Sequence, residues 1–195
     1  MDAAGIADEY AAIPRGYKRL GTLGRDALLD LFAHRLEEYD AGVSRCPVEK
    51  IGEEIARILE ARGRRTIAVP DGLPGAWLPR GFEFEDATHF DDYQLDRMDG
   101  VLTGCTVAIA ETGSIVLQNA AAQGPRILSL VPDYHLCVVF AEQVVETVPE
   151  SFAQLDATST LPTTFFSAPS ATADIEMTRI KGVHGPRFLD VVLVV

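Results

Sequence analysis

The 195-residue sequence contains only three cysteines, and they stand far apart, at positions 46, 105 and 137. They form neither a Cys-x-x-Cys pair nor the closely spaced run that binds zinc or an iron–sulfur cluster. A metal cofactor held by cysteines of this chain is therefore not expected. We predict instead that the three thiols are reduced and mostly buried, as free cysteines usually are.

Positive charge and long apolar runs are also scarce. The chain has 17 Lys and Arg residues against 29 Asp and Glu, a formal net charge of −12. An acidic surface repels nucleic-acid phosphates and anionic lipid headgroups, so we expect neither as a partner. No apolar run approaches the roughly 20 residues of a membrane-spanning helix, and the first residues lack the basic start and apolar core of a signal peptide. The expected location is the cytoplasm.

Familiar nucleotide and nucleophile motifs are missing as well. The sequence has no G-x-G-x-x-G, no P-loop and no G-x-S-x-G. It therefore predicts neither a nicotinamide or ATP site of the familiar types nor a serine on a nucleophile elbow.

What the sequence does contain is an alternation of helical and β-rich segments. Apolar spacing predicts helices over 24–39 and from Pro47 to Gly63, a short acidic helix over 91–98, and a helical segment over 141–155 interrupted at Pro149. Strands are expected at 66–70, 82–86, 106–110, 114–118, 135–140, 163–167 and 189–195, with another in LSLVP (128–132).

The turn residues ETG separate the strands TVAIA and SIVLQ, which predicts a β-hairpin. The whole pattern predicts an α/β domain whose largely parallel sheet is flanked by helices and carries one β-hairpin. The first twenty residues show no clear periodicity. We therefore expect an N-terminal arm over residues 1–23 and a single α/β domain over 24–195.

Three blocks of the sequence together match one family. They are TGCTVAIAETGSIVL (103–117), GPRILSLVPDYHLCVV (124–139) and PSATADIEMTRIKGVHGPRFLDVVLVV (169–195). In order and spacing the chain resembles the LUD-domain family, specifically the lactate-utilisation protein C type, over residues 24–195.

The resemblance implies a fold similar to that of glucosamine-phosphate deaminase, ribose-phosphate isomerase and CoA transferases. It also implies one component of a three-protein system that oxidises L-lactate to pyruvate. In such a system iron–sulfur clusters belong to partner subunits, and this chain binds a partner or substrate without a metal centre of its own. Whether it is catalytic within that iron–sulfur L-lactate dehydrogenase complex stays open. The family often has a histidine where this sequence has Asp190, so no role is carried over to that position.

A second hypothesis from the residues is a stand-alone enzyme, of isomerase, deaminase or transferase type, that acts on a small phosphorylated or carboxylated metabolite. Its motivation is the stretch PSATADIEMTRIKGVHGP (169–186), which gathers hydroxyls, acids and a histidine. We predict a helix from Thr172 to Lys181, which places Asp174 and Glu176 on different faces; on a strand they would share a face.

This stretch has two interpretations. In the structural one, Ser170 or Thr172 caps the helix, Asp174 complements its dipole and Glu176 pairs with Arg179. In the functional one, the hydroxyls at the helix start bind a carboxylate or phosphate, outside the carboxyl ends of the strands.

The remaining site residues follow from chemistry and position. His184 is the best titratable group, because histidine exchanges protons near neutral pH. Glu111 ends a strand, where this fold group offers a carboxylate to substrate. The predicted site makes Glu111 and His184 catalytic. The predicted anion-binding residues are Thr112, Gly113, Ser170, Thr172, Asp174, Glu176 and Arg187.

One further residue and one further segment bear on the site. His135 starts an apolar strand and is expected to be structural. The segment 123–126 offers polar groups that would line the same pocket as the predicted site.

Overall fold

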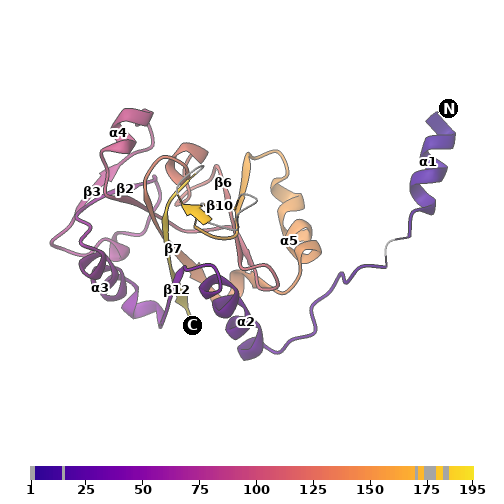
Figure 1. The fold of residues 1–195 in the computed structure, drawn as a ribbon, viewed down its shortest axis with the longest axis horizontal. Helices are drawn as coiled ribbons and strands as arrows, with labels where there is room; N and C mark the ends of the chain where they lie inside the picture. Colours follow the sequence, from indigo (N-terminus) through magenta and orange to yellow (C-terminus); the bar gives the residue numbers. More distant parts are fainter. Residues whose placement is uncertain (1–2, 15, 170, 174–178, 182–184) are drawn as a thin grey trace.

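The computed structural model describes residues 3–14, 16–169, 171–173, 179–181 and 185–195 (Figure 1). The α-helices of this part of the chain are α1 (Ala3–Ala12), α2 (Arg25–Glu37), α3 (Ile51–Arg62), α4 (Asp92–Asp96) and α5 (Val148–Leu155).

The centre of the molecule is a six-stranded sheet in which every neighbouring pair of strands is parallel. In spatial order its strands are β1 (Gly42–Cys46), β12 (Phe188–Val194), β7 (Tyr134–Phe140), β4 (Gly100–Thr103), β2 (Thr66–Val69) and β3 (Glu83–Asp86). The middle strands β12, β7 and β4 are almost wholly buried, which explains their continuous apolar sequences.

A smaller mixed sheet covers part of one face of the central sheet. Its order is β8 (Val144–Val145), β5 (Val107–Ile109), β6 (Ser114–Gln118) and β9 (Thr163–Phe166). Only β8 and β5 are parallel; β5–β6 is the predicted hairpin, and β9 runs antiparallel to β6. Gly113 in the β5–β6 turn has φ +60°, the left-handed conformation that glycine adopts without strain.

The two faces of the central sheet carry separate cores, because successive residues of a strand point to opposite sides. Helix α2 and the mixed sheet pack on one face, against Cys137, Val139 and Leu189. Helix α3 packs on the other face, against Leu136 and Val192, together with Trp77. Figure 1 shows α3 and α5 on opposite sides of the molecule.

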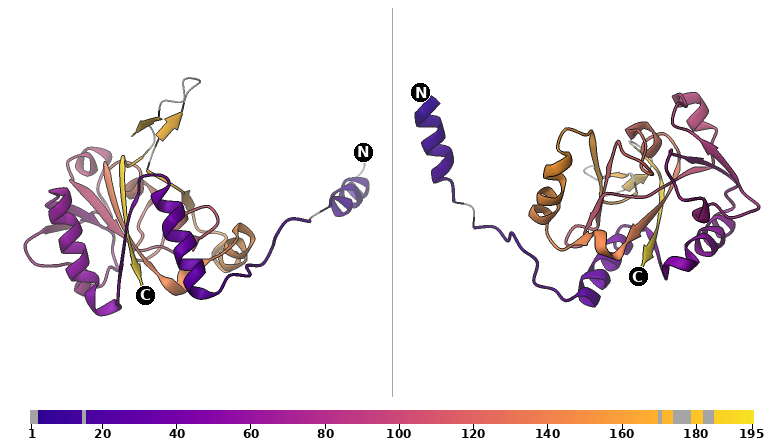
Figure 2. Two further views of the ribbon diagram at one scale, coloured as in Figure 1. Left: turned by 60° about the horizontal axis from the view of Figure 1, so that its bottom comes forward. Right: turned by 180° about the vertical axis from the view of Figure 1, so that it is seen from behind.

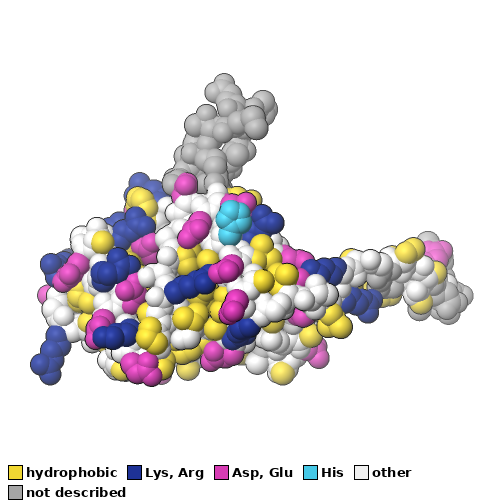
Figure 3. Space-filling model, turned by 90° about the horizontal axis from the view of Figure 1, so that it is seen from below, with side chains coloured by type: hydrophobic (Ala, Val, Ile, Leu, Met, Phe, Trp, Pro, Cys, Tyr) yellow, Lys and Arg dark blue, Asp and Glu magenta, His cyan; other side chains and the backbone are white. Residues whose placement is uncertain are grey.

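The N-terminal part of the chain extends away from this body. Figures 1 and 2 show α1 separated from the domain by an extended segment. Figure 3 shows basic and acidic side chains interspersed on the face seen from below, rather than gathered by sign. No helix in the described ranges is long and apolar enough to cross a membrane.

Most predicted elements are confirmed, with boundaries shifted by one or two residues. The helix ending at Gly63 is α3: Gly63 is its left-handed C-cap, and Pro47 precedes a turn of 3₁₀ helix, Val48–Lys50, that leads into it. All three cysteines are buried and unpaired, as predicted. Hydrogen bonding with Cys137 and burial raise the pKa of the Cys105 thiol well above its usual value.

The predicted helix over 172–181 is wrong where the structure describes it. Residues 171–173 form β10 (Ala171–Ala173) and 179–181 form β11 (Arg179–Lys181), paired antiparallel. The sheet system therefore has a second hairpin beside the single one predicted. Figure 2 shows β10 and β11 projecting beyond the central sheet. Threonine and isoleucine at the paired positions favour β structure, and that preference outweighs the cap-like signals.

Three other expectations also need correction. The segment 141–155 is not one interrupted helix: β8 precedes α5, whose capping box joins Thr147 and Glu150, with Pro149 in the first turn. LSLVP is not a strand, because Arg126–Ser129 forms a 3₁₀ helix and turns follow it. Residues 3–12 of the expected arm are helical.

Candidate functional site: a cavity at the amino ends of two central strands

A cavity of about 380 Å³ opens beside the amino ends of β7 and β12. His135 and Leu189 line it and are register partners across the two parallel strands. The 3₁₀ helix Arg126–Ser129, strand β9 and the residues after β9 supply other walls. Pro169 and Gly185, which bracket the β10–β11 hairpin, also border the cavity. Ligands of open α/β sheets usually bind at the carboxyl ends, so this cavity lies opposite to the predicted position.

His135 is a buried, neutral group of the cavity wall. It is 2% exposed, and its Nε2 lies 2.7 Å from the Thr103 Oγ1 on β4. Its ring also packs 5.0 Å from the ring of Phe166. Burial lowers the pKa of His135 to about 3, because the charged imidazolium loses its hydration. The imidazole therefore exchanges no proton near neutral pH, and it offers a hydrogen-bonding group without charge.

Arg126 supplies the charge of the cavity. Its side chain is exposed, and it makes no ion pair or hydrogen bond with the described residues. Of the described residues that line the cavity, Arg126 is the one ionised near neutral pH, and none is Asp or Glu. The segment 123–126 was expected to line the same pocket as Glu111; it contributes Arg126 to this cavity, which Glu111 does not line.

Hydroxyl groups form a second polar feature of the cavity. The Ser167 and Ser114 Oγ atoms lie 2.5 Å apart, and the Ser114 Oγ lies 2.6 Å from the Thr112 Oγ1. This chain of hydroxyls runs from the β5–β6 turn to the cavity wall. Ser129 also lines the cavity, and its hydroxyl donates to the Arg126 carbonyl oxygen, 3.0 Å away. The Ser129 oxygen therefore keeps lone pairs to accept from a ligand, and the Ser167 hydroxyl can donate to a ligand when it accepts from Ser114.

On the other face of the central sheet, at the amino end of β12, an ion pair takes the place of a cavity. Asp190 is 5% exposed and accepts two hydrogen bonds from Arg62, at 2.8 Å from Nε and 2.8 Å from Nη2. A Cβ at Gly42, its register partner on β1, would overlap the Asp190 carboxylate. The position that the family resemblance left open is therefore occupied by a structural carboxylate.

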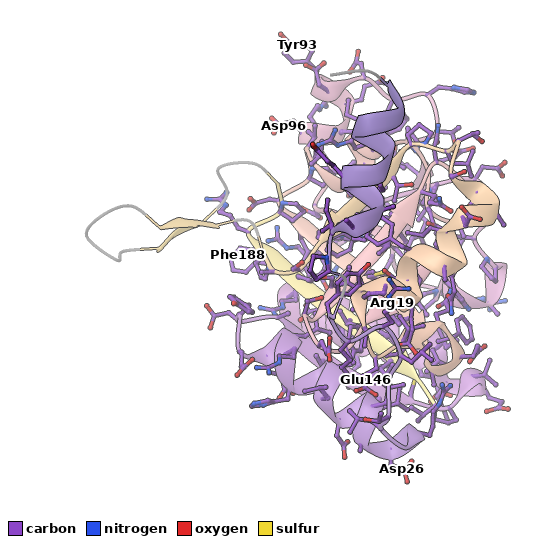
Figure 4. The ribbon with its side chains drawn as sticks, turned by 90° about the vertical axis from the view of Figure 1, so that its right-hand side faces the viewer. Arg19, Asp26, Tyr93, Asp96, Glu146 and Phe188 are labelled. Carbon is purple, nitrogen blue, oxygen red and sulfur yellow. The ribbon has the colours of Figure 1, made fainter. Side chains whose placement is uncertain are left out.

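Glu111 belongs to a third polar region, where the N-terminal arm meets the body. Lys18 pairs with Glu111 at 2.8 Å and with the buried Glu146. Glu146 also accepts from the Thr22 and Leu23 amides, at 2.5 and 2.7 Å. Lys18 and these amides lower the pKa of Glu146 below its usual range. Figure 4 shows Glu146 and Arg19 close together on this side of the molecule.

The structure brings only part of the predicted site together. Thr112 is connected to the cavity through hydroxyls, whereas Glu111 does not line it. Arg187 is paired with Asp133 at 2.5 Å and does not line it either. Thr172 is placed in β10 by its backbone. The other predicted residues lie outside the described residues: Ser170, Asp174, Glu176 and His184.

The sequence reasoning missed Ser129, Ser167 and the role of His135 in the cavity wall. His135 was expected to be structural, and its burial and its bond to Thr103 support that function too. The sequence signal that could have indicated these residues is a histidine or a serine within an otherwise apolar segment. Such a side chain is expected to be buried, and buried polar groups need hydrogen-bond partners.

Metal ligands are not grouped in the described part of the chain. Within those ranges, no group of three or more His, Cys, Asp or Glu side chains is arranged to hold a metal ion.

A parallel sheet that carries a small mixed sheet on one face defines an α/β domain, and comparisons with known proteins place it further. The LUD domain model matches residues 75–194. A lactate utilization protein C from Deinococcus radiodurans is 43% identical over 88% of this chain and 82% of its own length. Another, from an Exiguobacterium strain, is 30% identical over 95% of this chain and 85% of its own length.

A solved structure agrees. The crystal structure of a DUF162 family protein from Deinococcus radiodurans matches with a TM-score of 0.78 at 36% identity, covering 89% of this chain and all of that one. The chain belongs to the LUD-domain family, within its lactate utilization protein C group, which confirms the resemblance noted in the sequence.

Proposed function

We propose that this protein is a component of a lactate-utilisation system that oxidises L-lactate to pyruvate, in which it binds a substrate or partner and has no metal centre of its own. The observation that carries the proposal is the 43% identity with a lactate utilization protein C across 88% of the chain. The LUD domain match, residues 75–194, includes both strands that border the cavity.

The described cavity supports binding more directly than proton transfer. General acid–base catalysis needs a group whose pKa lies near the working pH, and burial holds the pKa of His135 at about 3. Glu111, the predicted acid, is engaged by Lys18 at the arm. A substrate- or partner-binding role therefore follows from the groups that the cavity does contain.

The proposal extends to partners, fold group and location. Iron–sulfur clusters belong to partner subunits in this scheme, and the protein works in the cytoplasm. The sheet and its crossovers are similar to those of glucosamine-phosphate deaminase, ribose-phosphate isomerase and CoA transferases. Residues 24–195 form the LUD-type domain, and residues 1–23 form an arm, which the contacts of Glu146 with residues 18–23 support.

The test is genetic and biochemical. Deletion of the gene is expected to impair growth on L-lactate as carbon source and leave growth on glucose unchanged. A tagged full-length chain from lactate-grown cells is expected to co-purify iron–sulfur subunits. Normal growth of the deletion strain on L-lactate would contradict the proposal.

A further inference from the structure

We propose that the cavity at the amino ends of β7 and β12 binds a small organic monocarboxylate of the 2-hydroxy or 2-oxo acid class. Arg126 holds the carboxylate, Ser167 donates to one of its oxygens or to the 2-oxygen, and Ser129 accepts from a 2-hydroxyl group. The carbon body lies against Leu130, Leu189 and Phe166. The choice of acid class rests on the proposed function; the assignment of an anion site does not.

Charge is the first argument for an anion. The chain has 29 acidic residues and a net charge of −12, yet the described lining of this cavity has no acid and one arginine. Some exposed arginines elsewhere on the molecule have carboxylate partners, as Arg35 has Glu38 and Arg187 has Asp133, whereas others, such as Arg97, form no ion pair with the described residues. Arg126 has no such partner among the described residues, so its guanidinium is free to bind a carboxylate from solution.

The buried polar groups are the second argument. His135 lies at the cavity wall with Nε2 bonded to Thr103, and its ring is neutral, so it adds no second charge beside Arg126. The Ser167 oxygen is already bonded to Ser114, which fixes its position. Hydroxyls held in place before binding lose less freedom when a ligand arrives.

Size and apolar lining favour an acid with a carbon chain over inorganic phosphate. A volume of about 380 Å³ lies in the range of sites for small organic ligands. Leucine and phenylalanine side chains line it beside the polar groups. Each methylene added to the ligand therefore gains roughly fourfold in affinity while space remains.

The experiment is isothermal titration of the purified full-length chain with L-lactate, pyruvate, 2-hydroxybutyrate, lactamide and inorganic phosphate. We expect the three acids to bind, 2-hydroxybutyrate about fourfold tighter than L-lactate. Lactamide, which keeps the shape of lactate without its charge, is expected not to bind. Phosphate is expected to bind more weakly than the acids.

Variants locate the site. Arg126→Gln is expected to weaken binding of the acids at least about tenfold, through loss of a charge-assisted contact. Its side chain is exposed, so the melting temperature is expected to stay unchanged. Arg97→Gln, which changes an exposed arginine outside the cavity, is the matched control and should bind as the wild type does.

Three results would overturn the inference: no binding of any acid, unchanged binding by Arg126→Gln, or loss of binding in Arg187→Gln alone. Preferential binding of phosphate would replace the acid class with phosphorylated ligands. These outcomes are distinct from failure of the proposed function. If deletion impairs growth on L-lactate but Arg126→Gln binds normally, the pathway role stands and the site assignment fails.

Discussion

The two faces of the central sheet differ in polar chemistry at the amino ends of β7 and β12. Tyr134 and Asp190 point to one face, and their neighbours His135 and Leu189 point to the other. On the face of α3, the Asp190 carboxylate is closed off by Arg62, and Arg64 lies over the Tyr134 ring at 5.6 Å. On the other face, Arg126 has no described partner beside a cavity. Each face has an arginine, but only Arg126 has no carboxylate partner among the described residues. The paired charge of Arg62 stabilises the fold, whereas the unpaired charge of Arg126 beside a cavity is suited to binding an anionic ligand.

Asp190→Ala tests the closed face and has the largest expected effect on stability. It removes two charge-assisted hydrogen bonds and leaves Arg62 without its partner, so the free energy of unfolding should fall by about 2–4 kcal/mol. Urea denaturation measures the loss. Asp96→Ala, at an exposed position shown in Figure 4, is the control and should change stability by less than about 0.5 kcal/mol.

The double variant Arg62→Ala with Asp190→Ala sharpens this result. Because neither charge is then left without a partner, part of the loss should be recovered relative to Asp190→Ala. Binding of acids by folded Asp190→Ala should equal that of the wild type. A binding defect in that variant would mean that the two faces are not separate.

His135→Gln tests the open face through pH. The folded-state pKa of His135 is about 3, below its ordinary value of 6.5, so the unfolded chain binds one more proton between these values. Stability from this group is therefore present above pH 6.5 and is lost as pH falls. Glutamine keeps a hydrogen-bonding group for Thr103 but does not titrate. Between pH 7 and pH 5 the wild type should lose about 2 kcal/mol more than the variant.

Urea unfolding at pH 5, 6 and 7 measures this difference. His89→Gln, at an exposed position, is the control and should follow the pH curve of the wild type. Parallel curves for the wild type and His135→Gln would show that His135 is not held neutral by burial.

Most helices and strands could be predicted from the sequence, whereas the residues of the cavity could not, for physical reasons. Helix α3 has strong apolar periodicity, and α2 has its buried residues at helical spacing. The buried strands are continuous apolar runs, and all of these signals depend only on local sequence. Strands β1 and β4 were not predicted: GVSRC has a polar centre, and β4 is only four residues long and begins with glycine. Their pairing with distant strands supplies what local preference does not.

The site was harder because its residues come together only through long-range packing. Ser114 and Ser167 are 53 positions apart, and Thr103 and His135 are 32 apart. The sequence indicated polar groups at 123–126 and Glu111 at a strand end, but it did not reveal that Arg126 lines a cavity without Glu111 or that Lys18 engages Glu111. The sequence alone does not show whether a charged side chain is already paired within the protein or can bind a ligand.

Glu146→Gln tests the arm anchor and has the smallest expected effect on the whole fold. The glutamine amide has no charge to hold Lys18, and it has one acceptor oxygen where glutamate has two, so its NH₂ group must face either Lys18 or the Thr22 and Leu23 amides. The arm should therefore detach while the domain stays folded. Limited proteolysis with trypsin, which cleaves after Lys18 and Arg19, should be about tenfold faster, with little change in melting temperature.

Because the folded-state pKa of Glu146 lies below its ordinary value of 4.5, the wild-type arm should stay attached above pH 4.5 and detach as pH falls below it. Glu142→Gln, at an exposed position nearby, is the control and should be cleaved at the wild-type rate. Equal cleavage of both variants would mean that the arm is held by contacts other than this carboxylate.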